Sequence, residues 1–373
     1  MDKLNTIIKE FKFDGNLNNI KENNQGNINS TYMLTGNDKK YLIQKINSYV
    51  FKEPYLVMKN IELVTSHITK KLEEANDSKH KTLKLIKTLK ERAMYTYTNM
   101  QGEKEYYRAY EYIDNCLSYN TVKESNNPIE TAYNAGKCLG FFHKLLDDFP
   151  TNLLADTIPN FHNTPNRYKD LLLSIQNKIT KRAYNHPEEI VDLLSKIDEY
   201  SIIWEYLDRG SIPLRVTHND TKLNNVLIDE ETNEAIAMID LDTVMPGSIL
   251  FDIGDGIRSV CANSFEDETD KSKIYLDMDL TKAYLKGYIE EMADYLTKEE
   301  VNYIATSIGT LTYELTIRFL TDYINGDTYF KIKYEEHNRD RFLNQYTLLQ
   351  DVEEKTPEIN KYVKTLYKTM KTK

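Results

Sequence analysis

A short stretch near the middle of the chain, RVTHNDTKLNNVLID at residues 215–229, places several reactive side chains close together. Asp220 is followed five residues later by Asn225, and Asp240 ends the next apolar run. Transfer of a phosphoryl group to a hydroxyl needs a carboxylate that orients the hydroxyl and accepts its proton. It also needs oxygen ligands for Mg²⁺, which a carboxylate and an amide can supply together with water. These residues therefore predict phosphoryl transfer, with Asp220 as the base and Asn225 and Asp240 as metal ligands.

The spacing in this stretch matches the pattern H-x-D-x-x-x-x-N, in which the aspartate is a base and the asparagine holds a metal. We expect His218 to support the loop by hydrogen bonds rather than to exchange protons. Lys222 lies where many kinases carry a lysine close to the γ-phosphate, and a solvated loop lysine is an equal alternative. Asp242 would share the face of Asp240 if the strand continues. Single residues of this kind are more often turn or capping residues, so only their combination favours chemistry.

Composition limits the class of protein to which this stretch can belong. The chain has 373 residues, long enough for two lobes with separate cores, and 40% of them are hydrophobic, as is usual in globular proteins. Its net charge of −10 argues against nucleic acid as the main partner. The sequence shows neither a secretory signal nor an apolar run that would span a membrane, so we expect a cytoplasmic protein without a membrane partner. The three cysteines form no CxxC pair and are expected to be free thiols.

Periodicity changes near residue 114 and divides the chain into two predicted lobes. Residues 30–35 and 40–46 read as a hairpin, which is followed by a helix with its first turn at Pro54 and by a second hairpin. Beyond that point the apolar spacing becomes helical. We therefore predict an α+β fold with a small β-rich nucleotide-binding lobe, 1–113, and a larger α-helical lobe for catalysis and acceptor binding, 114–373.

The nucleotide residues are predicted from weaker signals. The loop QGNINST, at residues 25–31, is poorer in glycine than the phosphate loop G-x-G-x-x-G, and it offers Asn27, Ser30 and Thr31 as phosphate-side candidates. Lys45 on the next strand is the candidate for the lysine that pairs with the phosphates. A shift of one residue in the strand would place Gln44 there instead.

Two further positions complete the predicted nucleotide site. Glu62, on the helix after this strand, is a candidate ion-pair partner for Lys45, although a charge on an amphipathic helix is more often solvated. The segment YEYID at residues 110–114 lies where a hinge would offer backbone groups to adenine. Glu111 and Ile113 are the expected providers of those groups.

The segments THNDTKLNNVLID and MIDLDTVMPGSILFDIGDGIR resemble the aminoglycoside phosphotransferase and choline kinase superfamily, and most closely its N-acetylhexosamine 1-kinases. The likeness continues through AGKCLGFFHKLL and ELTIRFLTDYINGDTYF, so it covers most of the chain. It implies a protein-kinase-like two-lobe fold, ATP and Mg²⁺ as cofactors, and phosphorylation of the anomeric hydroxyl of an N-acetylhexosamine such as N-acetylglucosamine or N-acetylgalactosamine. It also implies that Asp252, in FDIGD, supports the catalytic loop.

The same resemblance gives the acceptor candidates. Arg258, Arg318 and Asp322 lie in stretches similar to the sugar kinases, where they would bind a polyhydroxylated acceptor, and an ion pair between helices is an equal alternative for each. Asn219 replaces the arginine of H-R-D and no A-P-E follows, which argues against a protein substrate. Two other functions remain open, namely a kinase of an aminoglycoside, choline or another small alcohol, and a catalytically inactive nucleotide-binding scaffold. The complete set of Asp220, Asn225 and Asp240 disfavours the scaffold.

Overall fold

The computed structural model describes residues 2–23, 29–36 and 39–372, which form two compact units. Unit 1 consists of the segments Met1–Leu117, Asp148–Pro159 and Leu227–Pro246, and unit 2 of Ser118–Asp147, Asn160–Val226 and Gly247–Lys373. The predicted lobe boundary after residue 113 lies near the first of these breaks. The sequence pattern did not reveal that two later segments return to unit 1. One of them returns because strand β9 (Val226–Asp229) pairs with β7 (Cys116–Leu117).

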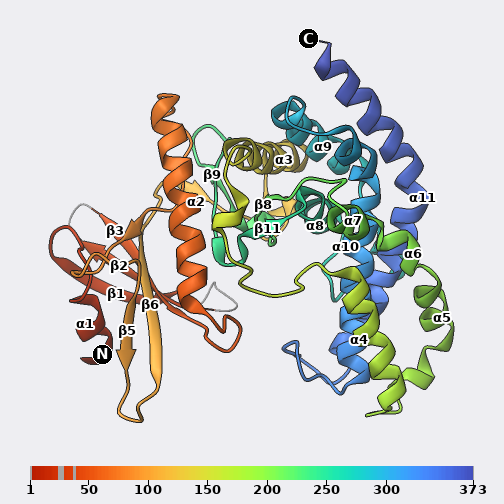
Figure 1. Ribbon diagram of the computed structural model, residues 1–373, viewed down its shortest axis with the longest axis horizontal. Helices are drawn as coiled ribbons and strands as arrows, with labels where there is room; N and C mark the ends of the chain where they lie inside the picture. Colours follow the sequence, from red (N-terminus) through yellow and green to blue (C-terminus); the bar gives the residue numbers. More distant parts are fainter. Residues whose placement is uncertain (1, 24–28, 37–38, 373) are drawn as a thin grey trace. The chain divides into compact units, whose positions relative to one another are not determined.

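Unit 1 is built on an antiparallel six-stranded sheet in the order β1-β2-β3-β6-β4, with β5 also paired to β6 (Figure 1). Besides β7 and β9, the helices and strands of unit 1 are, in chain order, α1 (Asp2–Ile8), β1 (Leu17–Asn23), β2 (Ser30–Gly36), β3 (Lys40–Ile46), α2 (Pro54–Glu74), β4 (Leu85–Ile86), β5 (Tyr95–Thr98), β6 (Lys104–Glu111), η2 (Thr151–Leu153), β10 (Ala235–Met238) and η5 (Leu241–Thr243). This sheet and the helical unit 2 confirm the predicted α+β fold class.

The register of β3 follows from the alternation of its side chains. Tyr41 and Ile43 are buried in a core cluster with Ile7 of α1. Gln44 is aligned with Arg108 of β6, and Lys45 with Tyr107 of that strand. Because successive strand residues face opposite sides of a sheet, Gln44 and Lys45 point to opposite faces.

Helix α2 begins as its sequence predicts, with Pro54 in the first turn, where a missing amide hydrogen costs nothing. Its buried residues Val57, Ile61 and Val64 recur at helical spacing and form one apolar stripe. Met58 belongs to the same buried face, and its sulfur lies 3.9 Å from the guanidinium of Arg108. The stripe therefore places α2 beside strand β6.

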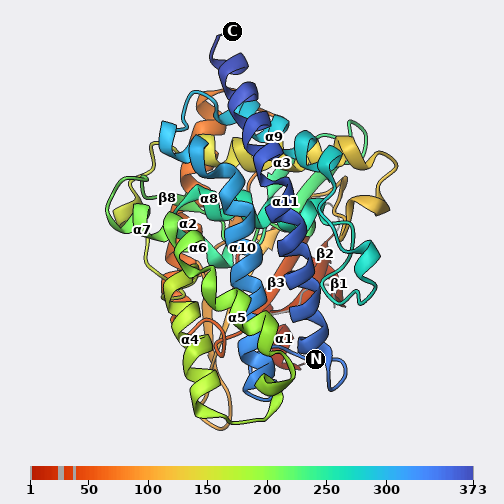
Figure 2. The same cartoon turned by 90° about the vertical axis from the view of Figure 1, so that its right-hand side faces the viewer.

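Unit 2 is almost entirely helical. Its elements are η1 (Val122–Glu124), α3 (Pro128–Leu145), α4 (Thr164–Asn177), η3 (Arg182–Asn185), α5 (Pro187–Ser195), α6 (Ile197–Tyr200), α7 (Ile202–Asp208), β8 (Arg215–Thr217), η4 (Leu223–Asn225), α8 (Ile249–Cys261), η6 (Lys271–Lys273), α9 (Met278–Met292), α10 (Lys298–Ile324) and α11 (His337–Lys371), and β11 (Met245–Gly247) lies at its border with unit 1. Helices α10 and α11 lie side by side for much of their length, as both cartoon views show (Figure 2).

Glycines allow α3 and α9 to pack with their backbones in close contact. A Cβ atom at Gly136 of α3 would lie 2.1 Å from the carbonyl oxygen of Tyr284, and one at Gly287 of α9 would lie 2.1 Å from that of Tyr133. No side chain fits at such distances. This packing fixes α9 against α3, and both helices contribute to the support of the site described below.

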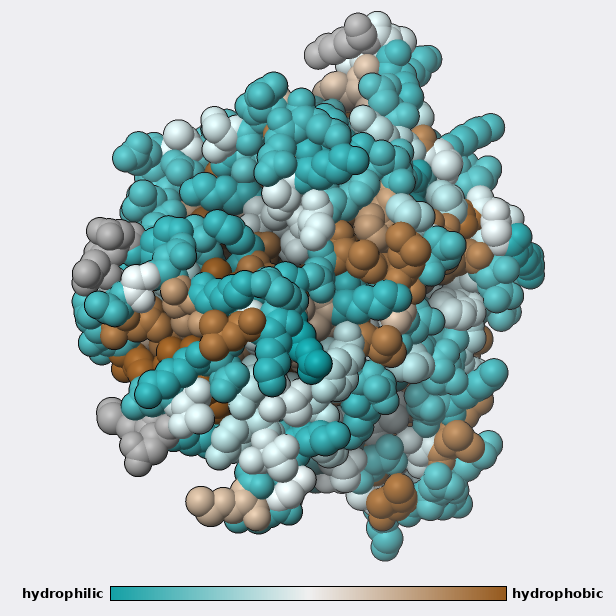
Figure 3. All heavy atoms as spheres, turned by 60° about the vertical axis from the view of Figure 1, so that its left-hand side comes forward, coloured by the Kyte–Doolittle hydropathy of each residue, from teal (hydrophilic) through white to brown (hydrophobic). Residues whose placement is uncertain are grey.

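The surface and the thiols are those of an ordinary globular protein. Hydrophilic side chains cover most of the face drawn in Figure 3, with apolar residues in separate groups between them. None of the helices among the described residues combines the length and apolar character needed to cross a membrane. Cys116, Cys138 and Cys261 are free, and burial raises the pKa of the Cys138 thiol to about 12. That thiol therefore stays protonated and unreactive at neutral pH.

Candidate active site

The residues after β8 form a loop whose backbone is fastened to a buried carboxylate. Asp252, in the first turn of α8, accepts hydrogen bonds from the backbone amides of His218 at 2.6 Å and Asn219 at 2.7 Å. Asp252 and His218 are both fully buried. A buried carboxylate is costly unless donors satisfy its oxygens, so these two bonds fix the chain directly before Asp220.

Two further helices hold the same carboxylate in place. His143 of α3 lies with Nε2 2.9 Å from Asp252 Oδ2, and its Nδ1 lies 2.9 Å from the hydroxyl of Tyr288 on α9. The hydroxyl of Thr221 donates to the Asp252 carbonyl oxygen at 2.9 Å. The loop is therefore positioned by α3, α8 and α9 together. The sequence motifs pointed to Asp252 but gave no local signal for His143 or Tyr288.

Asp220 itself is oriented by its neighbours in the loop. Asn219 has the left-handed φ of 63°, which asparagine tolerates better than most residues. The amide of Asp220 donates to Nδ1 of His218 at 3.3 Å. Nδ2 of Asn225 donates to the carbonyl oxygen of Asp220 at 2.8 Å and to its carboxylate at 3.1 Å. The structure thus brings the predicted base and the predicted asparagine ligand together.

Lys222 contributes a positive charge to this loop. Nζ of Lys222 lies 2.6 Å from Oδ1 of Asp220, and the lysine side chain is half exposed. Burial lowers the pKa of Lys222, but the carboxylates of Asp220, Asp255 and Glu266 together raise it above its ordinary value. The ammonium therefore stays protonated at neutral pH and supplies a positive charge beside Asp220.

The second predicted metal ligand lies in unit 1, in the turn after β10. Asp240 adopts the left-handed conformation, with φ 61°, and precedes the short helix η5. Asp242, inside η5, is only 4% exposed. Oδ2 of Asp242 accepts from Nδ2 of Asn29 at 2.7 Å, and its Oδ1 accepts from Nη1 of Arg108. The turn of Asp240 is therefore tied to the sheet through Asp242.

Arg108 is a residue that the sequence analysis missed. It lies on β6, is 1% exposed, and donates with Nε to Oε1 of Gln44 at 2.9 Å. Burial lowers the pKa of its guanidinium, but the carboxylate of Asp242, with a smaller contribution from Asp240, raises that pKa above its ordinary value. The only local signal was an arginine in the otherwise tyrosine- and alanine-containing run YYRAY of a predicted hairpin.

Of the three phosphate-side candidates, Ser30 and Thr31 lie at the start of β2 and Asn27 lies outside the described residues. Thr31 is buried, and its hydroxyl accepts from Nε2 of Gln44 at 3.1 Å. Ser30 is exposed. The described part of this loop therefore contacts the face of β3 that carries Gln44.

The candidate ion pair between Lys45 and Glu62 is not formed between these two described residues. Lys45 pairs instead with Glu105 at 2.8 Å, and Glu62 pairs with Lys87. The alternation of β3 explains the difference, because Lys45 lies on the face opposite Gln44 and is directed toward Glu105 of β6. Burial raises the pKa of Glu105, but hydrogen bonds from Lys3, Lys45 and a tyrosine lower it to about 2.

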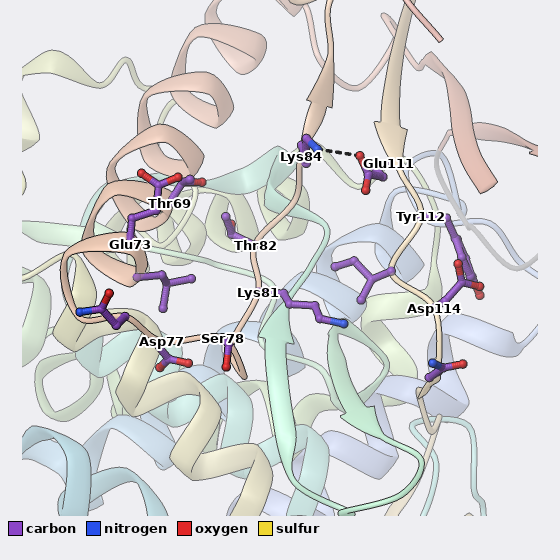
Figure 4. Close-up of a pocket in the computed structure, with 14 residues that line it drawn as sticks. Thr69, Glu73, Asp77, Ser78, Lys81, Thr82, Lys84, Glu111, Tyr112 and Asp114 are labelled. Atoms are coloured by element: carbon purple, nitrogen blue, oxygen red, sulfur yellow. Dashed lines mark hydrogen bonds and ion pairs between the residues drawn. The ribbon is translucent and has the colours of Figure 1, made fainter. Parts of the chain in front are cut away.

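The predicted hinge borders a cavity of about 900 Å³ within unit 1 (Figure 4). Glu111 and Ile113 line one side of it, and the end of α2 with the following segment lines the other. Lys84 lies across from Glu111, bonded to its carboxylate at 2.8 Å, and the Glu111 amide donates to the Lys84 carbonyl at 2.9 Å. That amide is therefore already used within the protein. Neither Ser30 nor Thr31 belongs to the lining, so this cavity is not the predicted phosphate site.

The acceptor candidate Arg258 is part of a buried ion-pair network. Its guanidinium lies 2.8 Å from Asp255, 2.9 Å from Glu266 and 3.3 Å from the side-chain oxygen of Gln345. Burial lowers the pKa of Arg258, but Asp255 and Glu266 raise it above its ordinary value. Arg258 therefore stays charged, with most of its donors used inside unit 2.

The other two acceptor candidates line a cavity of about 390 Å³ in unit 2. Asp322 accepts from the backbone amides of residues 328–330 at 2.8 to 2.9 Å and from Asn338, so its oxygens are used by the protein. Arg318 lies with its guanidinium carbon 5.5 Å from the ring centre of Phe330. Arg167 lines the same cavity, and its buried Nε has no hydrogen-bond partner among the residues that the structure describes. The cavity therefore offers two arginines and the carboxylate of Asp170, which also lines it.

Comparisons with known proteins identify a family and a fold for the chain. Residues 19–288 match the model of the phosphotransferase enzyme family, which is more than half of the chain. The structure is similar to a microcompartment-associated aminopropanol kinase, with 12% identity, a TM-score of 0.64, and 96% of this chain and 98% of that one covered.

Two other solved structures are similar over nearly their whole length. A spectinomycin phosphotransferase in complex with ADP and spectinomycin has 14% identity and a TM-score of 0.59, with 96% of this chain and 98% of that one covered. A choline kinase from Cryptosporidium parvum has 14% identity and a TM-score of 0.55, with 91% and 90% covered. At such low identity the likeness concerns the fold, and it confirms the fold that was predicted from the sequence motifs.

Proposed function

Because the chain belongs to the phosphotransferase enzyme family, we propose that it transfers the γ-phosphoryl group of ATP to a hydroxyl of a small molecule in the presence of Mg²⁺. Its membership confirms the superfamily predicted from the motifs. The observation that supports the proposed chemistry is the fixed loop in which the carboxylate of Asp220 lies between the amide of Asn225 and the ammonium of Lys222.

In the proposed reaction Asp220 orients the acceptor hydroxyl and accepts its proton as the oxygen bonds to the γ-phosphorus. The bond from that phosphorus to the bridging oxygen breaks, and ADP leaves with the bonding electrons. Lys222 supplies positive charge near the transferred group. His218 and Asp252 hold the loop so that the base is oriented before the substrate binds, which removes an entropic cost from the reaction.

The donor chemistry of the two metal candidates fits Mg²⁺. Asn225 offers an amide oxygen and Asp240 offers a carboxylate, and Mg²⁺ prefers oxygen ligands while it keeps water and phosphate oxygens. Among the residues that the structure describes, no group of three or more His, Cys, Asp or Glu side chains is arranged to hold a metal. When bound, Mg²⁺ would neutralise charge on the phosphate oxygens.

For the nucleotide, Asn27, Ser30 and Thr31 remain the proposed phosphate-side contacts and Ile113 the proposed adenine contact. The Glu111 amide is used by Lys84, whereas the Ile113 amide makes no backbone hydrogen bond within the described part of the chain. We therefore favour Ile113 over Glu111 as the donor to the base.

For the acceptor we propose an N-acetylhexosamine, phosphorylated at its anomeric hydroxyl. Besides the sequence motifs, the cavity that Arg318 lines supports this choice, because Arg167 and Tyr329 contribute further donors and an aromatic face. Guanidinium groups suit the oxygens of a neutral sugar, and the carboxylate of Asp170 in the same lining can accept from its hydroxyls. The alternative is a small alcohol that carries an amine, which is favoured by the aminopropanol, spectinomycin and choline in the names of the structures with this fold.

An ADP-release screen separates these acceptors. The wild-type protein would be incubated with ATP and Mg²⁺ and with N-acetylglucosamine, N-acetylgalactosamine, galactose, choline or kanamycin, with Asp220→Asn as the matched control. We expect rapid ADP release with an N-acetylhexosamine and almost none with the variant. Brisk turnover of choline or kanamycin alone would overturn the sugar proposal, and ATP binding without any turnover would favour the scaffold.

Phosphorus NMR of the product identifies the hydroxyl that carries the new phosphate. We expect coupling between the phosphorus and the anomeric proton of the sugar. Phosphate on the 6-hydroxyl would leave the kinase reaction in place and contradict the proposed regiochemistry.

A further inference from the structure

Arg108 is a buried charge of unit 1 to which the proposed reaction gives no role. Its guanidinium is 1% exposed and binds two partners, the carboxylate of Asp242 through Nη1 and the side-chain oxygen of Gln44 through Nε. Removing a guanidinium from water is costly, and only well-placed partners offset the cost. A buried guanidinium of this kind indicates that its position is important to the protein. Its partner Asp242 lies two residues after the predicted metal ligand Asp240.

The partners of Arg108 connect it to the segment that precedes β2. Asp242 also accepts from Nδ2 of Asn29, whose own side-chain oxygen accepts from the backbone amide of Asn47 at 2.9 Å. On the other side, Gln44 donates to the hydroxyl of Thr31. The network therefore joins β6, β3 and the start of β2 to the turn of Asp240, all within unit 1.

This network lies where other kinases use a different pair. In protein kinases a lysine on the third strand pairs with a glutamate of the following helix and with the phosphates. In this chain that strand presents Gln44 toward Arg108, whereas Lys45 lies on the opposite face with Glu105. The guanidinium of Arg108 thus lies directly across from Gln44, on the neighbouring strand.

Building on the proposed phosphotransfer, we propose that Arg108 is a positioning residue that replaces the strand lysine in this chain. Its bond to Asp242 fixes the turn that carries Asp240. Through this turn, Arg108 determines how tightly the protein binds Mg²⁺ and how efficiently it uses ATP. Asp240 needs this support because its left-handed backbone is unfavourable for a residue with a side chain.

The test compares Arg108→Lys and Asp242→Asn with the wild type. Arg108→Lys keeps the charge and loses the bond to Gln44, and Asp242→Asn keeps the shape and loses the charge. Arg92→Lys, at an exposed arginine of unit 1, is the matched control. The readouts are kcat, the KM for ATP, the Mg²⁺ concentration at half-maximal rate, and the thermal midpoint with and without a saturating non-hydrolysable ATP analogue and Mg²⁺.

We expect both variants to raise the half-maximal Mg²⁺ concentration about 10- to 100-fold, the usual effect of removing a group that orients a metal ligand. Arg92→Lys should change nothing, and Lys45→Ala should have a smaller effect than Arg108→Lys. Adding Gln44→Lys to Arg108→Met should restore part of the lost Mg²⁺ affinity, because it returns a cation to the neighbouring strand.

Two results would overturn the role of Arg108. The first is that Arg108→Lys and Asp242→Asn both fold and need no more Mg²⁺ than the wild type. The second is that both variants unfold and that neither the nucleotide nor Mg²⁺ restores the fold, which would mark Arg108 as a purely structural residue. The wild-type protein reports separately on the proposed function. If it uses no ATP with any acceptor, the phosphotransfer proposal itself fails, and the proposal for Arg108 fails with it.

Discussion

The Asp220 loop of unit 2 and the Asp240 turn of unit 1 each depend on a buried carboxylate, but the partners of the two carboxylates differ. Asp252 accepts from two backbone amides and lies next to the ring of His143. Asp242 accepts from the guanidinium of Arg108 and from one side-chain amide. Backbone donors fix the path of the chain itself, whereas an ion pair fixes a side chain. The loop of Asp220, the proposed base, is therefore held more directly than the turn of Asp240, the proposed metal ligand, which depends on an interaction between residues far apart in sequence.

The largest effect is expected at the metal ligand of unit 1. Asp240→Ala removes a carboxylate that we assign to Mg²⁺, so turnover should fall to the background, while circular dichroism shows a folded protein. EDTA should abolish the wild-type activity in the same way, and added Mg²⁺ should restore it. Normal turnover in Asp240→Ala would contradict the assignment of Asp240 as a metal ligand, and the turn could then no longer be compared with the Asp220 loop.

The next largest effect tests the buried carboxylate of unit 2. Asp252→Ala leaves the amides of His218 and Asn219 without their acceptor, and loss of one partner from a buried charged network costs about 3–5 kcal/mol. This cost is measured as the difference in the free energy of unfolding between the variant and the wild type, determined by urea titration. Asp277→Ala, at the N-cap of α9, is the control and should cost about 1 kcal/mol. Equal losses in the two variants would show that Asp252 is no more than a helix cap.

A smaller effect is expected for the cation beside the base. Lys222→Met keeps the length of the side chain and removes its charge, and loss of one group that stabilises transition-state charge lowers kcat about 10²-fold. The KM for the acceptor should change little, because the ammonium acts on the transferred group. A kcat equal to that of the wild type would make Lys222 a solvated loop residue, the other interpretation of its position.

The smallest effect contrasts the partly buried ion pairs of Glu105 with the fully buried pair of Arg108. The pKa of Glu105 is lowered to about 2, so its ion pairs contribute stability above the ordinary pKa near 4.5 and lose it as the pH falls toward 2. The difference in urea midpoint between wild type and Glu105→Gln should therefore be present at pH 7 and shrink at pH 3. A difference that does not depend on pH would mean that Glu105 acts through packing.

The sequence was most informative where the interacting residues are close together in the chain. Asp220 and Asn225 are five residues apart, and their contact follows from one loop. The sheet and helices were likewise predictable, because alternation in β3 and the stripe of α2 are local patterns. The fold could therefore be predicted from short segments together with their family resemblance, and the contact between Asp220 and Asn225 from a single loop.

Long-range partners could not be derived in this way. Arg108 and Asp242 are 134 residues apart, and His143 and Asp252 are 109 apart. No local pattern indicates which charges meet across such distances. Lys45 illustrates the consequence, because a basic residue on the third strand was the natural candidate for the phosphates, whereas the strand register directs it toward Glu105.

The most direct measurement of the proposed chemistry is the steady-state kinetics of Asp220→Asn with Mg²⁺, ATP and the preferred acceptor. The substitution keeps the shape of the side chain and removes its charge and its ability to accept a proton. We predict that kcat falls about 10²- to 10⁴-fold, the usual contribution of a general base, with little change in the KM for ATP. A kcat within about threefold of the wild type in a folded variant would contradict the assignment of Asp220 as the base and, with it, the proposed role of the whole loop.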